Sequence, residues 1–449
     1  MTLPVLRDDA LRSTSGGFEL LLSLPWIRSL PAESLRDVAV RLDGRDVDVV
    51  AHVPGDWWYL QDRVALRGSV PVAAGAHEVD VTFCLAIPYL AAGPDGPLAL
   101  PFRDARTLVA TGAGETAGAT DAGSAALPPG WTLTASAFNW TPHVIHAASS
   151  AADIAVGVVR GGVAEAIEIE AGQVWRTFPE PAGAEVDGLR AALDAAGGRV
   201  SIVGASIDEW TLDGRRRSDE ERLAFLVPQL RAAARVGAIG ARVPLGQAGP
   251  GLLRLLQPTL DELDIVLFEE AQGHQTPQSS AQAYDEVAAL DDPHIRVLLD
   301  ISMLMPALPV TYLERLRAAG VSPELMRRIE TEWRDPATHG AVVDLLRAGG
   351  VPGPVHTLYM NMLVRFGRTD AAELRDVLPL VSGVHLKFWD LDDADGRVSN
   401  PIRDIGRELR AAAFTGTLCS EWGGNEWLDD DPATMTRAHL ALARSLLAG

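Results

Sequence analysis

Four apolar runs in the second half of the sequence each end in a residue that could bind a metal ion. The runs are LFEEAQG with Glu270, LLDIS with Asp300, VHLKFWD with His385, and LCSEWGG with Glu421. Three carboxylates and one imidazole suit a hard divalent cation such as Mn²⁺ or Mg²⁺ better than a zinc ion in a thiolate site. A single acid at a strand end is often a helix cap or an ion-pair partner, whereas four potential ligands at consecutive strand ends favour a site.

The first of these runs offers two adjacent acids, Glu269 and Glu270. Alternate residues of a strand face the same side, so Glu270 and Gln272 would point together toward one face. Gln272 carries an amide that can bind a sugar hydroxyl. We therefore prefer Glu270 as the ligand and predict that Gln272 contacts substrate.

The sequence has one lysine, Lys387, among 39 lysines and arginines. It alternates with His385 and Trp389 and would face the same way. Burial and a neighbouring cation can lower the pKa of a lysine enough for acid–base chemistry, whereas an arginine does not deprotonate. A chemical role for Lys387 is therefore favoured over that of a solvated charge.

Other side chains near these strand ends could contact a substrate. Trp389, Trp422 and Trp427 flank the same ends, and tryptophan faces stack well on sugars and aromatic rings. Ordinary core packing is the alternative for each. His274 follows Glu270 by four residues and is a candidate general base, with an exposed loop histidine as the alternative.

Strand-like apolar runs alternate with helical stretches in the part of the chain that carries these residues. The helical stretches include Gly188–Ala196, Ser218–Val236 and Met435–Leu447. Eight such units predict a (β/α)8 barrel, whose active site lies at the carboxyl ends of the strands. The gap before the seventh run is too long for one helix and predicts a helical insertion at about 306–365. The predicted strands are 131–138, 163–170, 199–205, 238–245, 263–270, 295–301, 381–388 and 415–421.

The first 111 residues have a different pattern. In HEVDVTFCLAI, the residues from His77 to Ile87 alternate between apolar and polar faces, and Phe18–Pro25 and Leu35–Leu42 read as further strands. Short strands separated by turns predict a small antiparallel β-sandwich over residues 1–111. Residues 112–129, rich in Gly, Ala, Thr and Ser, predict a flexible linker. The barrel would then occupy residues 130–449.

Composition excludes several classes of function. The net charge of −21 argues against a protein that binds a nucleic-acid duplex and against a polybasic membrane anchor. No dinucleotide fingerprint and no GxxxxGK[ST] phosphate loop occurs, so neither NAD nor ATP is expected. The sequence has two cysteines and no run long enough to span a membrane, and its start lacks the pattern of a signal peptide. A cytoplasmic protein is expected.

The segments VHLKFWDLDD and NPIRDIGRELRAAAFTGTLCSEWGG resemble the end of a xylose-isomerase-like TIM barrel, in particular the alpha subunit of the C-glycoside deglycosidases. The segments GFELLLSLPWIRSLPAESLRDVAVRLDGRDV and GAHEVDVTFCLAIPYL resemble the beta subunit of the same enzymes. The chain thus looks like a natural fusion of the two subunits. The family metal quartet maps onto Glu270, Asp300, His385 and Glu421, with Mn²⁺ expected and Mg²⁺ or Co²⁺ as alternatives.

This resemblance implies β-elimination of the aglycone from a 3-oxo-glycoside. Lys387 would stabilise or protonate the developing oxyanion, His274 would be the base, and the sandwich would help close the aglycone side of the pocket. The resemblance also implies an aromatic aglycone, a homo-oligomer and an upstream sugar 3-oxidoreductase. A metal-dependent sugar isomerase or epimerase is the alternative, and a carbohydrate-binding sandwich on an inactive barrel is a third.

Overall fold

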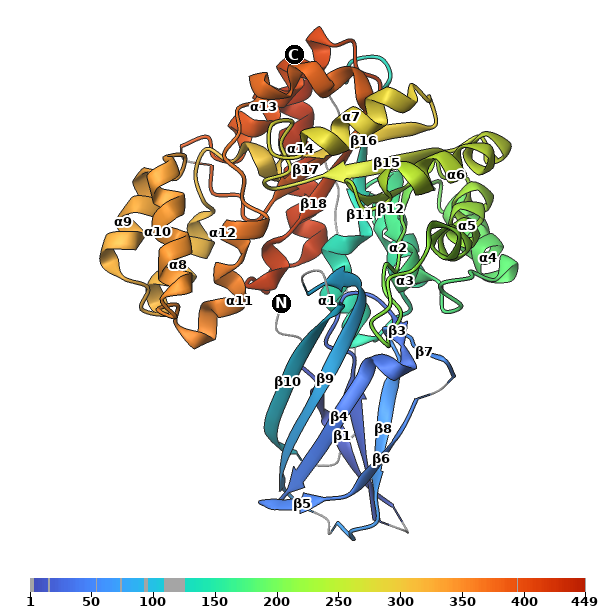
Figure 1. The fold of residues 1–449 in the computed structure, drawn as a ribbon, viewed down its shortest axis with the longest axis vertical. Helices are drawn as coiled ribbons and strands as arrows, with labels where there is room; N and C mark the ends of the chain where they lie inside the picture. Colours follow the sequence, from blue (N-terminus) through green and yellow to red (C-terminus); the bar gives the residue numbers. More distant parts are fainter. Residues whose placement is uncertain are drawn as a thin grey trace.

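The computed structural model describes residues 4–14, 17–53, 55–72, 75–92, 96–108, 126–393 and 395–448. An antiparallel sandwich stands against one end of a parallel barrel, and a group of short helices projects from the side of that barrel (Figure 1). Most of the predicted linker, 112–129, lies outside the described residues. No helix in the described part of the chain is long and apolar enough to cross a membrane.

The sandwich consists of two four-stranded sheets, β1-β2-β8-β6 and β10-β9-β4-β5, with a small β3-β7 pair beside them. Leu35–Leu42 forms a strand with the predicted bounds, and Asp43 and Gly44 turn the chain with positive φ angles of 49° and 77°. The strands are β1 (Leu6–Thr14), β2 (Gly17–Ser23), β3 (Leu30–Pro31), β4 (Leu35–Leu42), β5 (Arg45–Val47), β6 (Val49–His52), β7 (Trp57–Trp58), β8 (Arg63–Gly68), β9 (His77–Ala91) and β10 (Pro97–Leu108).

Strand β9 follows the predicted alternation closely. Val79, Val81, Phe83 and Leu85 are buried between the two sheets, because every second side chain of a strand faces the same side. Ala86 was expected on the polar face but is buried as well. The side chains of this strand therefore supply much of the sandwich core.

Eight parallel strands close into the barrel in chain order, as predicted. Each observed strand overlaps its predicted run, with ends that differ by at most three residues. The strands are β11 (Trp131–Ser136), β12 (Ala166–Glu170), β13 (Arg199–Gly204), β14 (Gly240–Pro244), β15 (Val266–Ala271), β16 (Ile295–Asp300), β17 (Val381–Phe388) and β18 (Gly416–Trp422).

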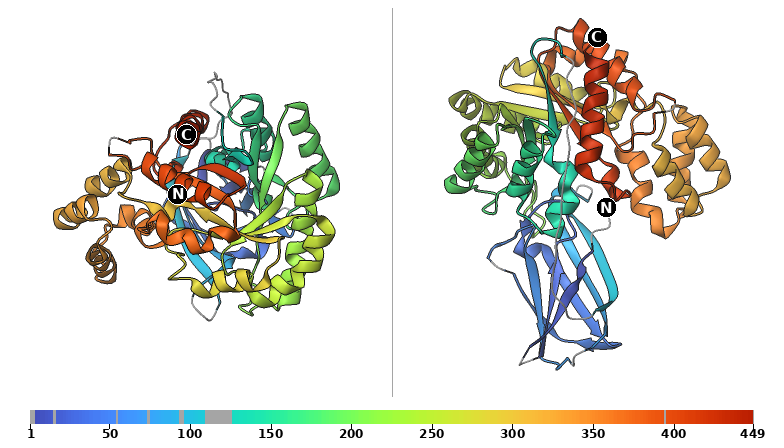
Figure 2. Two further views of the ribbon diagram at one scale, coloured as in Figure 1. Left: turned by 90° about the horizontal axis from the view of Figure 1, so that it is seen from above. Right: turned by 180° about the vertical axis from the view of Figure 1, so that it is seen from behind.

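Helices cover the outside of this barrel, which is clearest in the view from above (Figure 2). Three of them correspond to the predicted helical stretches. The α-helices are α1 (Thr141–His146), α2 (Ala151–Arg160), α3 (Ala171–Val174), α4 (Gly183–Ala195), α5 (Asp219–Val236), α6 (Gly249–Leu263), α7 (Ala281–Leu290), α13 (Ser399–Ala411) and α14 (Pro432–Leu447). Short 3-10 turns η3 (Ala137–Trp140), η4 (Ile301–Leu304), η6 (Ala371–Leu380) and η7 (Gly424–Glu426) follow or precede barrel strands.

Between β16 and β17 the chain forms a group of helices that we call the insertion. It has an apolar core separate from that of the barrel, and Trp389 and Trp427 close this core from the barrel side. Tyr312 packs against the rings of Phe366 and Trp427 within it. The helices are α8 (Val310–Ala318), α9 (Pro323–Thr331), α10 (Pro336–Arg347), α11 (His356–Tyr359) and α12 (Asn361–Val364).

The sandwich contacts the loops that follow the first four barrel strands. Arg28 forms a buried ion pair with Asp208 at 3.0 Å, and the Tyr59 hydroxyl donates to the carbonyl of Gln173 at 2.8 Å. Gln247, in the loop after β14, donates to the carbonyls of Ile207 and Tyr89. Because loops after barrel strands lie at the carboxyl end, the sandwich covers part of the face where barrel active sites form.

Candidate metal centre

Glu270, Asp300, His385 and Glu421 come together inside the carboxyl end of the barrel. They end or nearly end β15, β16, β17 and β18, and all four are buried. The parallel register places Asp300 beside His385 and Lys387 beside Glu421. Four adjacent strands thus direct these side chains into one small space.

The four side chains are close enough to share one ion. One ligand atom from each lies within 4.8 Å of the others. His385 Nδ1 is 3.0 Å from Glu270 Oε1 and 2.9 Å from Glu421 Oε2. Three carboxylates and an imidazole at this spacing form a donor set that suits a hard divalent cation.

One candidate ligand atom, Asp300 Oδ2, is buried and has no hydrogen-bond partner. His385 Nδ1 and Glu421 Oε2 lie 2.9 Å apart, and Lys387 Nζ lies 3.2 Å from the same glutamate oxygen. A buried polar atom without a partner is costly, and native proteins usually satisfy it. A cation bound by the four side chains would satisfy Asp300 Oδ2, and the residues present fit such an ion.

The charges of the cluster shift its pKa values in opposite directions. Burial alone would raise the pKa of Glu421, but Lys387 and His385 outweigh it and hold that pKa well below its usual value. Burial dominates at Asp300 and raises its pKa to about 6, against the opposing effect of Lys387. The pKa of His385 lies well above its usual value because the surrounding carboxylates outweigh its burial.

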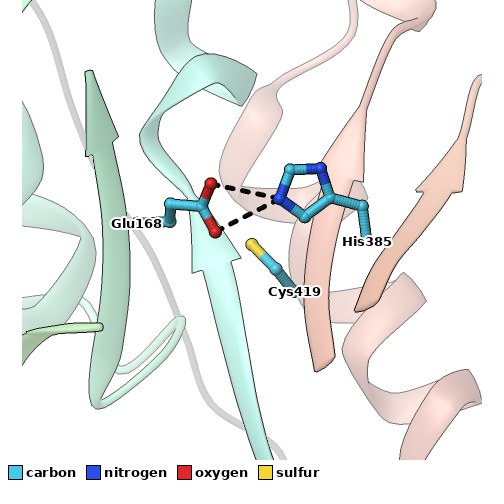
Figure 3. A group of neighbouring side chains, drawn as sticks. All are labelled: Glu168, His385 and Cys419. Carbon is cyan, nitrogen blue, oxygen red and sulfur yellow. Dashed lines mark hydrogen bonds and ion pairs between the residues drawn. The ribbon is translucent and has the colours of Figure 1, made fainter. Parts of the chain in front are cut away.

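Glu168 holds the other side of the histidine ring (Figure 3). Its two carboxylate oxygens lie 3.1 and 3.2 Å from His385 Nε2. A carboxylate that accepts from the second nitrogen of a ligand histidine fixes the tautomer and the ring orientation. Glu168 therefore leaves Nδ1 free to face the other three residues of the cluster.

Cys419 also lies near Glu168 and His385, and these three side chains form a second group with potential ligand atoms. Burial raises the pKa of the Cys419 thiol well above its usual value, and a protonated thiol is a poor ligand. The Glu168 oxygens already have partners in His385 and Arg242. The cluster of four is therefore the better candidate site.

Arg242, on β14, forms hydrogen bonds to one residue of the cluster and to two acids beside it. Its guanidinium donates to Glu270 Oε2 at 2.8 Å and also to Glu168 and Glu170. Burial raises the pKa of Glu170 to about 7, although Arg242 opposes this effect. One arginine thus fixes a candidate ligand and two neighbouring acids.

Sequence reasoning missed Glu168, Glu170 and Arg242. The available signal was the stretch AIEIE at the end of the second predicted strand, where two acids alternate with isoleucine. Alternation in a strand enclosed by helices places acids on the interior face, which is unfavourable unless they are paired. Arg242, in the stretch GARVP, is the partner that this pattern requires.

The single lysine borders the cluster. Lys387 Nζ lies 3.2 Å from Glu421 Oε2 and 5.6 Å from the centre of the Phe138 ring, and its side chain is 7 % exposed. Both contacts keep the ammonium group at the edge of the four residues. From this position Lys387 can donate a hydrogen bond to a substrate oxygen.

The adjacent acid Glu269 lies outside the cluster. It faces the opposite side of β15, and its carboxylate accepts from the Gly246 backbone N–H at 2.9 Å. Burial raises its pKa to about 7. Of the two acids, the structure therefore brings Glu270 to the other ligands, as the preference from alternation expects.

The structure does not bring His274 together with the four residues. Its Nε2 lies 3.4 Å from the carbonyl oxygen of Met362, and its ring lies 5.7 Å from that of His339 in the insertion. Burial and the charge of Arg368 lower its pKa, so the neutral imidazole is favoured at neutral pH. Gln272 is half-buried, and its backbone N–H donates to Gln275 at 3.2 Å.

The tryptophans predicted to bind substrate have the contacts of core residues. Trp422 is 1 % exposed and donates its Nε1–H to the carbonyl of Trp389 at 2.7 Å. Trp389 packs edge-on against Phe366, and Trp427 donates to Thr311 at 2.9 Å. That these rings stack on substrate stays a prediction, and in the structure Trp389 and Trp427 belong to the apolar core of the insertion.

The comparison with curated proteins gives the same family for both parts of the chain, whereas no protein-family model matches it. A C-glycoside deglycosidase alpha subunit of Arthrobacter globiformis is 28% identical over 296 residues, 63% of this chain and 83% of its own length. A 3'-dehydrocarminate deglycosidase alpha subunit of a Microbacterium species is 27% identical over 300 residues, 62% of this chain and 85% of its own. The beta subunit of that name is 29% identical over 103 residues, 19% of this chain and 78% of its own.

The chain is similar to both subunits of the C-glycoside deglycosidases. The resemblance expected from the sequence is therefore confirmed. The alpha subunits match about 60% of this chain, and the beta subunits match about a fifth to a quarter of it.

Solved structures resemble this one only distantly. A 3-keto-D-glucoside 4-epimerase of E. coli has a TM-score of 0.38 at 15% identity and covers 64% of this chain and 94% of its own. A D-allulose 3-epimerase of a Methylomonas species has a TM-score of 0.42 at 12% identity and covers 72% and 99%. These scores are too low to support an inference, and the barrel is established by its own strand pairing.

Proposed function

We propose that this chain is a metal-dependent lyase that cleaves a C- or O-linked 3-oxo-glycoside by β-elimination. The observation that carries the proposal is the buried cluster of four side chains whose ligand atoms lie within 4.8 Å of one another, namely Glu270, Asp300, His385 and Glu421. The similarity of the chain to deglycosidase subunits of both kinds supports the choice of reaction.

The chemistry of the substrate explains why such a site would be needed. A carbonyl group at C3 makes the proton on C2 acidic, and loss of that proton allows the bond from C1 to the aglycone to break. A divalent cation, with Mn²⁺ favoured and Mg²⁺ or Co²⁺ as alternatives, would supply electrostatic stabilisation of the negative charge that develops on the C3 oxygen. The departing aglycone takes up one proton from a general acid in place of its bond to C1, so the expected products are the free aglycone and an unsaturated keto-sugar.

Lys387 is the residue that we propose for this oxygen. Its ammonium group, 3.2 Å from Glu421, can donate a hydrogen bond or a proton at the edge of the cluster. The C2 proton needs a base, for which we propose His274, because its lowered pKa favours the neutral imidazole. For this role His274 must reach the sugar from the loop after β15.

Further parts of the proposal concern the cellular setting. We propose that the chain combines the two subunits in one polypeptide and acts in the cytoplasm as a homo-oligomer. Since the substrate must already carry a ketone at C3, a sugar oxidoreductase that acts at C3 has to supply it.

Incubation of the purified protein with Mn²⁺ and a panel of 3-oxo-glycosides, followed by mass spectrometry of the products, tests the proposal. Release of the aglycone with an unsaturated keto-sugar is expected. A stereoisomer of the input sugar with no released aglycone would instead indicate an isomerase or epimerase, which can use the same cluster to stabilise negative charge on a sugar oxygen. Glu421→Gln, which removes a ligand charge, is the control and should release no aglycone.

A further inference from the structure

The insertion returns to the barrel through a short segment, residues 364–367, that lies against the end of β16. The backbone N–H of Gly367 donates to the carbonyl of Ser302 at 2.8 Å. A Cβ atom on Gly367 would lie 2.3 Å from the Cα atom of Met303, so glycine is required for this approach. Ser302 and Met303 follow the candidate ligand Asp300 in the sequence. The segment therefore passes beside the end of the strand that carries this ligand.

The same segment also lies on the loop that follows Glu270 and β15. A Cβ atom on Gly273 would lie 2.3 Å from the carbonyl oxygen of Val364 and 3.1 Å from the Cα atom of Arg365. Gly273 has a φ angle of 57°, which also favours glycine. Two glycines thus allow the backbone of the insertion to lie directly on the carboxyl end of the barrel, and Arg365 is the charged residue brought there.

The side chain of Arg365 reaches the loop that follows β18. Its guanidinium donates to Glu426 Oε1, and Asn361 of α12 donates to Glu426 Oε2 at 3.0 Å. Glu426 belongs to η7, shortly after the candidate ligand Glu421. Arg365 therefore joins the ends of β15 and β16 to the loop after β18, and three of the four candidate ligands lie on these strands.

The charges of the cluster act on this arginine. Burial lowers the pKa of Arg365, and the carboxylates of Glu421 and Asp300 oppose this effect. Its side chain is nevertheless 32% exposed, and it lines a cavity of about 870 Å³ between the sandwich and the insertion. Arg365 is thus surrounded by protein and still accessible to a ligand from one side.

The guanidinium of Arg365 has donors left for such a ligand. Glu426 accepts from Nη1, and within the described part of the chain no hydrogen bond is formed by Nε or Nη2. Glu426 also balances the positive charge of the arginine. An uncharged oxygen, such as a sugar hydroxyl, can therefore accept from the remaining donors, whereas an anion would add an unpaired charge to a partly buried site.

We propose that Arg365 is a substrate-binding residue supplied by the insertion, and that its guanidinium donates to a hydroxyl oxygen of the sugar held at the metal cluster. Glu426 is its positioning residue. The identity of the ligand as a 3-oxo sugar rests on the proposed function. In this role the insertion completes the sugar site, because the arginine comes from no strand of the barrel.

Calorimetric binding of free 3-oxo-glucose to the full chain loaded with Mn²⁺ tests the proposal. Arg365→Met should weaken binding about tenfold or more, because a charge-assisted hydrogen bond is lost. Arg365→Lys keeps the charge beside Glu426 and so guards against a loss of folding, and it should also weaken binding, because one ammonium group does not replace the planar set of donors. Arg317→Met is the matched control, since Arg317 forms an exposed ion pair with Glu330 within the insertion, and it should leave the affinity unchanged.

Deoxy sugars show whether Arg365 contacts a hydroxyl group. The 2-, 4- and 6-deoxy forms of 3-oxo-glucose are compared in the wild type and in Arg365→Met. For at least one of them the substitution should have almost no effect, because the hydroxyl that accepts from the arginine is already missing. The affinity for Mn²⁺ should not fall in Arg365→Met, because the positive charge of the arginine opposes the ion.

Three results would overturn this role of Arg365. They are equal losses for all four sugars, unchanged affinity for 3-oxo-glucose in both Arg365 variants, and no binding of 3-oxo-glucose to the wild type. None of these measurements depends on cleavage. A protein that binds the sugar through Arg365 and releases no aglycone from any 3-oxo-glycoside would therefore overturn the proposed reaction alone.

Discussion

His385 lies at the centre of the candidate site because acids contact both of its ring nitrogens. Glu168 lies against Nε2, while Glu270 and Glu421 lie against Nδ1. Three of the four candidate ligands thus have a charged neighbour, since Arg242 also binds Glu270 and Lys387 lies beside Glu421. A ligand set that is held in this way keeps its geometry before an ion binds.

We expect Glu168→Gln to weaken Mn²⁺ binding by about 10- to 100-fold, because the amide cannot hold the tautomer and orientation of His385 as the carboxylate does. Calorimetric titration of the metal-free protein with Mn²⁺ measures this change. Glu165→Gln is the matched control, since Glu165 is an exposed acid near the start of the same strand. Equal affinity in both variants would show that Glu168 does not position the ligand.

We expect Lys387→Arg to lower kcat by about 100-fold or more, because an arginine keeps the charge but does not give up a proton. Mn²⁺ content and the midpoint of thermal unfolding should stay close to the original values. Steady-state kinetics with a cleaved 3-oxo-glycoside, together with metal analysis, provide the test. Full activity in this variant would mean that the only lysine of the sequence has no chemical role.

We expect His274→Gln to lower kcat by a similar factor with unchanged Mn²⁺ affinity, because the residue would act on the substrate and not on the ion. The pH profile of kcat/KM should also lose its acidic limb. His339→Gln, at the neighbouring ring, is the control and should retain that limb. If His274→Gln keeps both the rate and the pH profile, another residue is the base.

At the scale of elements, α14 packs against β18 through a buried histidine. His439 Nδ1 lies 2.8 Å from the Ser420 hydroxyl, and its ring stacks on Phe388 at 3.9 Å. Burial lowers the pKa of His439 from 6.5 to about 3. The folded protein therefore holds this ring in the neutral form.

The lowered pKa of His439 predicts how stability depends on pH. Below pH 6.5 the unfolded chain binds a proton at His439 and the folded chain does not. The contribution of this residue to the free energy of unfolding is therefore complete above pH 6.5 and decreases below it. Between pH 7.5 and 5.5 the loss should be about 1.4 kcal/mol. Urea unfolding at both pH values measures this loss. The free energy of unfolding should fall by about 1.4 kcal/mol less in His439→Gln than in the wild type.

The exposed His52 provides the control for this experiment. His52→Gln should show the same pH dependence of the unfolding free energy as the wild type. Identical slopes for the wild type and His439→Gln would show that the ring is not kept neutral by burial.

The strands and helices could be predicted from the sequence. The side-chain contacts around the candidate metal cluster could be predicted only in part. The period of two in β9 and the regular spacing of eight apolar runs have direct structural causes, because each buried face requires apolar side chains at fixed intervals. Alternation also separated Glu270 from Glu269. Periodicity locates the strand end before Trp389 but does not show what packs on this ring, and in the structure the ring is part of the core of the insertion.

At the scale of the whole molecule, the sandwich is fixed to the barrel by polar contacts that the sequence could not show. They join residues far apart in the chain, such as Arg28 with Asp208, and Arg176 with Asp62. The Arg28 guanidinium also lies 4.1 Å from the centre of the Tyr89 ring. These contacts hold the sandwich against the loops at the carboxyl end of the barrel.

We expect Arg28→Met to destabilise the folded protein by about 3–5 kcal/mol, because it leaves the carboxylate of Asp208 buried without its partner. Arg176→Met is the matched control across the same interface. Its arginine is 56% exposed, so its loss should cost about 1 kcal/mol or less. Denaturant unfolding of both variants measures the difference, and equal costs would show that the buried pair does not fix the two parts.

The most direct test of the account combines the metal, the cluster and the reaction. The purified protein is treated with a chelator and incubated with a 3-oxo-C-glycoside, and the aglycone and sugar are followed by mass spectrometry before and after Mn²⁺ is added. We predict that aglycone and unsaturated keto-sugar form in equal amounts only after Mn²⁺ is added, and that Glu421→Gln forms neither. Release that does not depend on the metal, or conversion of the sugar to a stereoisomer with the aglycone still attached, would contradict the account.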